Sequence, residues 1–267
     1  MFFRNCLPAG LPQREVTEFN PELTPQVLAL VTAIFLLSGV IKGTLGIGLP
    51  TTAVTLMILV LEPKTALALV VLPIVVTNFQ QLYSARNVKP VVLRFRFMAL
   101  LVFISLGITT YFTARLESDQ IRLVIGTAIC IFSITFLAWP SFQLPMKGDR
   151  FFQGFFGILS GVMGGMTSIW APPMVIYLIG RKTDKDTFIA ATGFIFSVGS
   201  IPLLIGFILN GMLSLELGWV SLLCVIPSLL GFRIGMSIRS KLSSSLFRKL
   251  VLLAFLILGL RTILMEA

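Results

Sequence analysis

A single lysine, Lys42, lies inside the glycine-rich stretch IKGTLGIGLP, which runs from Ile41 to Pro50 between apolar segments. An ammonium group at membrane depth is costly unless it faces a partner, a water-filled cavity or a bound anion. We therefore predict that Lys42 contacts an anion. The alternative is that its long stem carries the charge to the membrane interface, because Lys42 falls near the end of a predicted helix.

The glycine-rich stretch occurs twice in the chain. SGVIKGTLGIGLP, residues 38–50, aligns without a gap with SGVMGGMTSIWAP, residues 160–172, at a spacing of 122 residues. The same register pairs Thr65 with Thr187 further along the chain. This indicates one ancestral unit used twice.

Both copies end in proline at the start of an unusually short apolar segment, residues 49–61 and 172–180. Each segment could be a tilted span, a broken helix or a re-entrant hairpin. Helix N-termini at such breaks carry a positive dipole and exposed amides that can hold an anion. The structural alternative is close helix packing through small residues, with Ser and Thr bonding their own backbone. The candidate substrate-binding residues are Lys42, Gly43, Thr44, Gly46, Gly48, Pro50, Asn78, Gln81, Gly164, Gly165, Thr167, Ser168, Pro172 and Ser197.

The composition shows what surrounds these residues. Of the 267 residues, 56% are hydrophobic and 12% charged, and the mean hydropathy is +0.97. Apolar stretches near the roughly 20 residues needed to cross a bilayer recur along the chain, and such runs satisfy their backbones as helices. We predict an all-α membrane protein, a polytopic helix bundle of two inverted repeats with about 8–10 membrane segments.

Loop charges predict the topology of this bundle. We expect a short polar N-terminal tail at residues 1–24, a first membrane repeat at 25–140 and a second at 150–265, with a last helix at 250–265. Alternate loops are rich in Lys and Arg and are expected inside the cell. Their basic residues are Arg86 and Lys89; Lys147 and Arg150; Arg181, Lys182 and Lys185; and Arg239, Lys241, Arg248 and Lys249.

The loops between them hold fewer basic residues and are expected outside. The two sets alternate only if both short segments cross the membrane, which gives about ten crossings, termini outside and inverted halves. Two re-entrant hairpins, which would place the loop at residues 181–186 outside, are the alternative.

Several kinds of chemistry have no support in the sequence. There is no His, and the acidic residues fall in predicted loops or at helix edges, so a proton relay or a catalytic base is not indicated. Three isolated cysteines form no metal or redox spacing, and the chain lacks a nucleotide-binding loop. Lys and Arg number 21 against 11 Asp and Glu, a net charge of +10 that orientation in a membrane explains without nucleic acid. We expect no enzyme activity, no cofactor and no metal.

The two glycine-rich copies are familiar. SGVIKGTLGIGLP followed by PKTALALVVLPIVVTNFQQL, and the second copy GILSGVMGGMTSIWAPPMVIYLIG, resemble the sulfite exporter TauE/SafE family of membrane permeases. The resemblance covers essentially the whole chain after the tail. It implies a multi-pass permease of the plasma membrane for small anions such as sulfite, sulfonates and other organosulfur acids.

One position departs from the family pattern. Many relatives carry a Gly-x-Gly-Gly run where this chain has Gly46-Ile47-Gly48-Leu49 in the first copy and Ser168-Ile169-Trp170 in the second. Trp170 therefore stands where a small residue is expected, and it would narrow or reshape a pocket.

The function that we expect is transport of a small anion by alternating access between the two repeats. The expected partners are a small anionic solute and the lipid bilayer, and a homo-oligomer is compatible with the sequence. The alternative is a non-transporting membrane subunit or assembly factor whose glycine faces pack against a partner protein.

Overall fold

The computed structural model describes residues 23–85, 87–138, 143–145 and 147–239 and the single residues 256 and 260. Over these residues the chain forms helices and no strand, so the predicted all-α class is confirmed. The helices are α1 (Pro25–Leu45), α2 (Leu49–Met57), α3 (Pro63–Tyr83), α4 (Val88–Thr113), α5 (Ser118–Ala138), α6 (Asp149–Thr167), α7 (Ala171–Gly180), α8 (Lys185–Leu209) and α9 (Leu215–Arg239). Nearly all of the predicted tail and of the predicted last helix lies outside the described residues.

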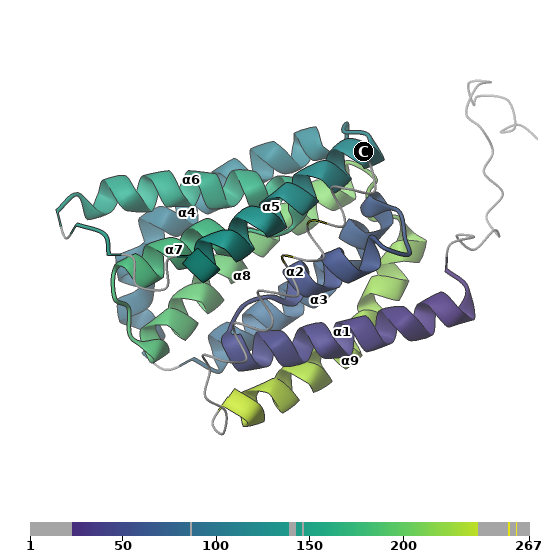
Figure 1. Cartoon of the computed structure of the whole chain (residues 1–267), viewed down its shortest axis with the longest axis horizontal. Coiled ribbons are helices and arrows are strands. Elements are labelled where there is room, and N and C mark those ends of the chain that lie inside the picture. Colours follow the sequence, from purple (N-terminus) through teal and green to yellow (C-terminus); the bar gives the residue numbers. More distant parts are fainter. Residues whose placement is uncertain are drawn as a thin grey trace, which may run out of the picture.

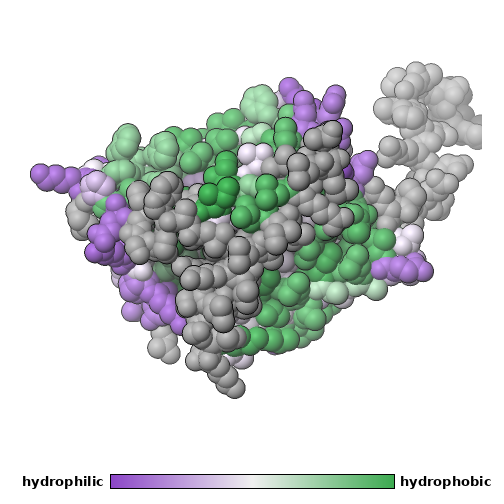
Figure 2. Space-filling view, in the orientation of Figure 1, coloured by the Kyte–Doolittle hydropathy of each residue, from purple (hydrophilic) through white to green (hydrophobic). Residues whose placement is uncertain are grey.

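Five of these helices are long and apolar enough to cross a bilayer, namely α1, α3, α4, α8 and α9. Large hydrophobic side chains stay exposed along several of them, among them Leu100, Ile108 and Leu223. In the space-filling view, hydrophilic residues gather at the left and right ends, and most of the coloured surface between them is hydrophobic (Figure 2). A surface of this kind is stable against lipid, and the protein is a polytopic membrane protein.

Local sequence explains where the helices begin and end. Thr24 caps α1 by accepting a hydrogen bond from the backbone N–H three residues on, and Pro25 follows at the first helical position. The helix ends at Gly46, whose φ of 81° suits glycine. Asp184 caps α8 through the N–H of Thr187 at 3.0 Å. That hydrogen bond lowers the pKa of the Asp184 carboxyl.

The helix order of the first half recurs in the second. A shift of 122 residues carries the first position of α3, Pro63, onto that of α8, Lys185, and the last position of α1, Leu45, onto that of α6, Thr167. The most extensive packing joins α1 to α9 and α4 to α6. Exchange of the two halves turns each of these pairs into the other, so the first helix of one half packs against the fourth helix of the other half (Figure 1).

Glycines allow these helix pairs to approach closely. A Cβ atom added to Gly43 of α1 would lie 2.2 Å from the carbonyl oxygen of Phe232 in α9, and one added to Gly235 would lie 2.8 Å from Cα of Gly43. In the other pair, a Cβ atom on Gly165 of α6 would lie 2.8 Å from the carbonyl oxygen of Leu106 in α4. Small residues spaced four apart are a common way to pack membrane helices, and both pairs use them.

A proline inside α3 leaves one backbone carbonyl without its helical donor. Pro73 has no N–H, so the carbonyl of Leu69 lacks its usual partner. Ser221 of α9 donates its hydroxyl to this oxygen at 2.8 Å. Since lipid offers no hydrogen bonds, this contact satisfies the broken turn and fixes α9 to α3. One turn later, Thr77 donates to the carbonyl of Pro73 at 2.6 Å.

Candidate functional site

The two short helices, α2 and α7, begin at the same small pocket. Its walls come from both halves of the chain. The lining residues are Lys42, Ile47, Gly48, Pro50, Asn78, Trp170, Ala171 and Phe196. The free space inside is about that of one water molecule. The two glycine-rich stretches therefore meet in the folded chain, around a pocket with almost no free space.

Lys42 reaches this pocket from α1 and is 1% exposed. Its ammonium donates to Oγ1 of Thr77 at 3.0 Å and to Oδ1 of Asn78. Both acceptors are neutral, and no carboxylate is among the described residues that line the pocket. An ammonium has three N–H donors, so one remains after these two bonds. The side chain does not extend toward the interface, which was the alternative interpretation of its position.

A chain of contacts leads from Lys42 across to the second half. The amide nitrogen of Asn78 donates to the backbone carbonyl of Phe196 in α8 at 3.1 Å. The ring of Phe196 meets the indole of Trp170 edge to face, with 5.7 Å between centroids. Trp170 is 2% exposed, and its indole nitrogen has no hydrogen-bond partner among the described residues. Four segments thus hold one another in place around the pocket.

Comparison with known families decides what this arrangement belongs to. The sulfite exporter TauE/SafE family matches residues 31–262, which include both glycine-rich stretches and every described pocket residue. The chain belongs to the sulfite exporter TauE/SafE family. No curated protein and no solved structure matches it. Together with the apolar helices, the TauE/SafE match makes the protein a membrane transporter.

In this TauE/SafE protein the short helices offer fewer amides to an anion than their sequence position suggests. Pro50 occupies the second position of α2, and Pro172 and Pro173 follow Ala171 at the start of α7. Proline has no N–H, so α7 keeps only the amide of Ala171 among its first three residues. The positive end of each helix dipole still faces the pocket, but it amounts to a partial charge. The full positive charge among the described lining residues is that of Lys42.

Some of the predicted site residues lie outside the pocket, at the end of α1. A Cβ atom on Gly46 would be 3.8 Å from both the guanidinium of Arg239 and the amide of Gln81. Gln81 donates to Oγ1 of Thr192 at 2.8 Å and so ties α3 to α8. The carbonyl of Thr44 accepts from Nε of Arg239 at 3.0 Å. These residues form a polar layer that joins the end of α1 to α9 and α3 to α8.

The remaining predicted site residues have structural contacts. Thr167 and Ser197 donate to carbonyls of their own helices, at 2.7 Å in each case, as membrane Ser and Thr often do. Gly164 lies against Cβ of Trp170, while Gly43 and Gly165 lie in the two helix crossings described above. Ser168 ends α6 with a φ of 58°, and its buried hydroxyl has no hydrogen-bond partner among the described residues.

Five contacts in or beside the pocket were absent from the predicted binding set, and one of them is Trp170, which the sequence marked only as a residue that would narrow or reshape a pocket. Thr77 precedes Asn78 in α3, and its role as an acceptor for Lys42 could have been inferred from that neighbour. Ile47 and Ala171 flank predicted residues and line the wall with apolar groups. Phe196 comes from a uniform apolar run in α8, where the sequence carries no signal that distinguishes it.

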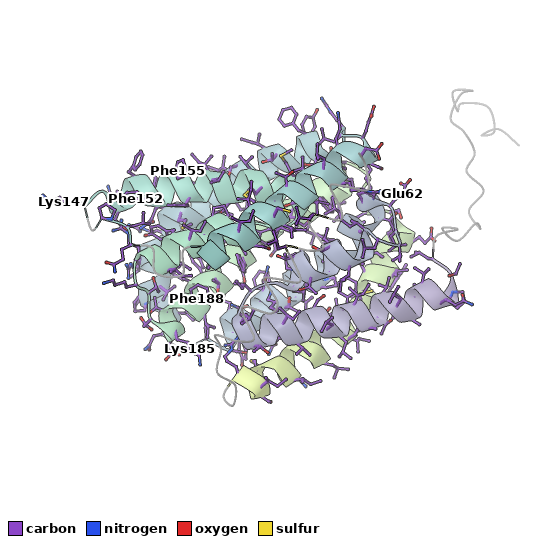
Figure 3. All side chains as sticks on the ribbon, in the orientation of Figure 1. Glu62, Lys147, Phe152, Phe155, Lys185 and Phe188 are labelled. Carbon is purple, nitrogen blue, oxygen red and sulfur yellow. The ribbon has the colours of Figure 1, made fainter. Side chains whose placement is uncertain are left out.

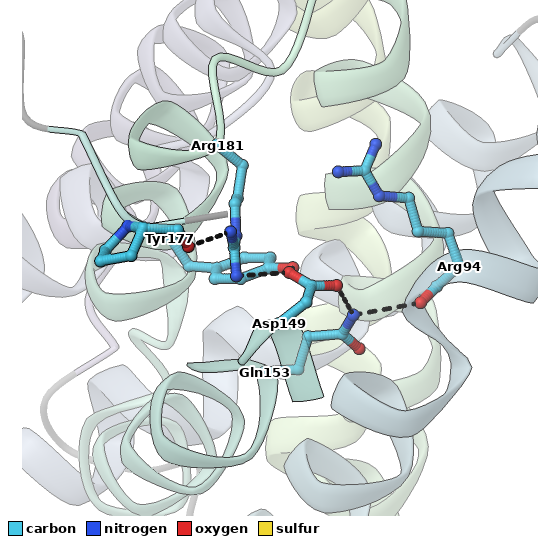
Figure 4. Close-up of polar contacts among 6 residues, drawn as sticks. Arg94, Asp149, Gln153, Tyr177 and Arg181 are labelled. Atoms are coloured by element: carbon cyan, nitrogen blue, oxygen red, sulfur yellow. Dashed lines mark hydrogen bonds and ion pairs between the residues drawn. The ribbon is translucent and has the colours of Figure 1, made fainter. Parts of the chain in front are cut away.

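A second polar cluster of this TauE/SafE protein lies at the C-terminal end of α7, the end opposite to Trp170. Figure 4 shows its side chains. Nη2 of Arg181 pairs with Oδ1 of Asp149 at 2.7 Å, and its side chain is 2% exposed. The hydroxyl of Tyr177 donates to the same carboxylate at 2.8 Å, and the amide of Gln153 donates to its other oxygen at 2.8 Å. Gln153 also reaches the backbone carbonyl of Arg94 at 3.3 Å. The cluster therefore fastens α7 to α6 and α4.

Proposed function

We propose that the protein is a plasma-membrane permease for a small anion, sulfite, a sulfonate or a related organic acid, and that Lys42 binds the anionic group. The observation that carries the proposal is the buried ammonium of Lys42, whose partners among the described residues are neutral and which lines a pocket at the start of two short helices.

The electrostatics of Lys42 favour an anion. Removing an ammonium from water costs several kcal/mol, and hydrogen bonds to neutral acceptors offset only part of that cost. A single negative charge in the pocket would neutralise the site and accept the remaining N–H of Lys42. The hydroxyl of Thr77 and the amide of Asn78 hold Lys42 in one orientation while the pocket fills and empties. The site therefore supports binding of one singly charged anion better than binding of a cation.

The arrangement of the halves supports alternating access. In Figure 1, α1 begins at the right end of the molecule and α6, its counterpart in the second half, begins at the left end. The packing is preserved when the halves are exchanged, and the pocket lies between them. Inverted halves around a central site can rock so that either end opens. In this proposal the closed pocket is an intermediate between the two open forms.

The alternative function, a membrane subunit that does not transport, was suggested by the glycine faces of the helices. Its glycine faces were expected to pack against a partner protein. Helices of the same chain cover these faces instead. Helix α9 packs against Gly39 and Gly43 of α1, and α4 packs against Gly161 and Gly165 of α6.

The test combines binding and flux. We would measure the melting temperature of the detergent-purified protein with sulfite, methanesulfonate, sulfate and acetate, since a ligand that binds the folded state raises it. Flux of the stabilising anion would then be followed in proteoliposomes. Lys42→Gln should abolish both responses, whereas Lys89→Gln, which removes an exposed lysine at the start of α4, should leave both intact.

Two outcomes would contradict the proposal. One is a Lys42→Gln protein that binds and transports the anion as well as the wild type does. The other is a wild-type protein that folds and inserts but responds to none of the anions in either assay.

A further inference from the structure

We propose that Trp170 sets the size limit of the transported anion, which restricts the pocket to anions no larger than about a methyl-substituted oxyanion. This inference rests on the function proposed above and adds a specificity-determining residue to it.

At two aligned positions of the repeat, one half has a large residue where the other half has glycine. At the repeat spacing of 122 residues, Lys42 of the first half aligns with Gly164 of the second, and Gly48 aligns with Trp170. Each half thus contributes one long side chain to the pocket region, a cation from one half and an indole from the other. Gly48 and Trp170 both line the pocket, from opposite halves.

Packing holds the indole in this position. A Cβ atom on Gly164 would lie 2.7 Å from Cβ of Trp170, so the indole fits only because position 164 has no side chain. Gly199 of α8 lies on its other side, where a Cβ atom would be 3.8 Å from the ring. Phe196 meets it edge to face. Because Gly164, Gly199 and the ring of Phe196 pack against it, the indole forms a fixed wall of the pocket.

The wall determines which anions fit. The space next to Lys42 is about that of one water molecule, so a bound anion must displace wall atoms even when it is small. An outward shift of lining side chains other than the indole, such as Ile47, would admit the three oxygens of a sulfite or a sulfonate head group. A phenyl substituent would need the volume that the indole itself occupies. The indole nitrogen, which lacks a partner among the described residues, could donate to the bound oxyanion.

The experiment compares two sulfonates that carry the same head group, methanesulfonate and benzenesulfonate. Their apparent Kd values would be measured by thermal shift for the wild type, Trp170→Phe and Trp170→Leu. We expect the wild type to prefer methanesulfonate by at least about tenfold. The preference should shrink stepwise from Trp to Phe to Leu, as the wall becomes smaller. Phe207→Leu removes an equally buried aromatic ring from α8 outside the pocket and should keep the wild-type preference.

The results separate this inference from the proposed function. If the wild type binds neither sulfonate and none of the other anions tested above, the proposed function fails. If it binds sulfite but neither sulfonate, the pocket excludes even a methyl substituent and the proposed size limit is overturned. If it binds both equally well, Trp170 is not a size filter, and no variant is needed to reach that conclusion. If it prefers methanesulfonate and the preference is unchanged in whichever Trp170 variant folds, the size limit lies elsewhere and the inference is overturned.

Discussion

The ammonium of Lys42 lies 3.0 Å from Oγ1 of Thr77. Thr77 follows Pro73 by one turn in α3, where the proline removes one backbone hydrogen bond of the helix. A lysine from α1 is thus held by hydroxyl and amide oxygens of α3 and not by a carboxylate. The proposed anion site requires such neutral partners, because a structural ion pair would place a carboxylate beside the ammonium. The amide of Asn78 can be converted into that carboxylate by the change of a single group.

The first prediction replaces the amide of Asn78 by a carboxylate. In Asn78→Asp, the new charge lies beside Lys42 and neutralises it, so the pocket no longer attracts an anion. We expect the protein to fold and the apparent anion affinity to fall by at least about tenfold. Thermal shift with the stabilising anion measures this loss. The same charge placed two residues along α3 by Gln80→Glu lies outside the pocket and should leave the affinity unchanged. Undiminished binding in Asn78→Asp would show that Lys42 does not face the anion.

The second prediction concerns the crossing of α1 and α9. In Gly235→Ala, the new Cβ would lie 2.2 Å from the carbonyl oxygen of Val40, and backbone atoms cannot move aside as a side chain could. We expect a loss of stability of about 1–3 kcal/mol or failed assembly. Gly218→Ala is a matched change in the same helix, with nothing within 4 Å of the new atom. It should be neutral or stabilising, by up to about 1 kcal/mol.

Thermal melting and the yield of monodisperse protein in detergent would measure both glycine variants. Equal behaviour of Gly235→Ala and Gly218→Ala would mean that the two helices do not cross as closely as the glycines allow.

Much of the fold was predictable because a helix that crosses lipid must be apolar over its whole length, so the hydropathy of the sequence indicates where each helix lies. The expected short segment at residues 172–180 differs from α7 by one residue. The ends of α1 also have recognisable sequence signals, since Thr24 caps its start and Gly46 ends it. The expected second segment, 49–61, extends beyond α2, which ends at Met57. Its apolar residues continue past the helix as a turn, and hydropathy cannot distinguish the two.

The site was predictable only where a charge or a repeat marked it. Lys42 stood out as a cation in apolar sequence, and the repeat identified Gly48 and Pro50. By contrast, Gly43 and Gly165 carry the same composition signal and serve helix packing, since a glycine looks alike in both roles. Phe196 reaches the pocket through the fold of α8 against α3, which depends on contacts between residues far apart in the chain.

The third prediction tests whether the short helices cross the membrane. Lys147, before α6, and Lys185, at the start of α8, lie at the left end of the molecule, whereas Glu62, before α3, lies at the right end (Figure 3). In a background in which all cysteines are replaced by alanine, Lys147→Cys and Lys185→Cys should react with an impermeant maleimide from one side of the membrane. Glu62→Cys should react from the other side. If α7 were re-entrant, α6 alone would cross between residues 147 and 185, and these two cysteines would react from opposite sides.

The last prediction concerns the Asp149–Arg181 pair, which holds α7 at the end away from the pocket. The side chain of Arg181 is 2% exposed and that of Asp149 is 38% exposed. Asp149→Asn leaves the buried guanidinium without its carboxylate and weakens the acceptor of Tyr177 and Gln153. Since Asp149 is partly solvated, we expect a loss of about 2 kcal/mol, below the usual cost of breaking a wholly buried pair.

Melting in detergent compares Asp149→Asn with Asp186→Asn, which neutralises an exposed carboxylate in the first turn of α8 and should change stability by less than about 0.5 kcal/mol. Arg181→Met, which removes the buried cation and keeps an apolar stem, should recover part of the loss when combined with Asp149→Asn, because no unpaired charge then remains. If the double variant is instead as unstable as the sum of the two single variants, the two side chains act independently and the pair does not fasten α7 to α6.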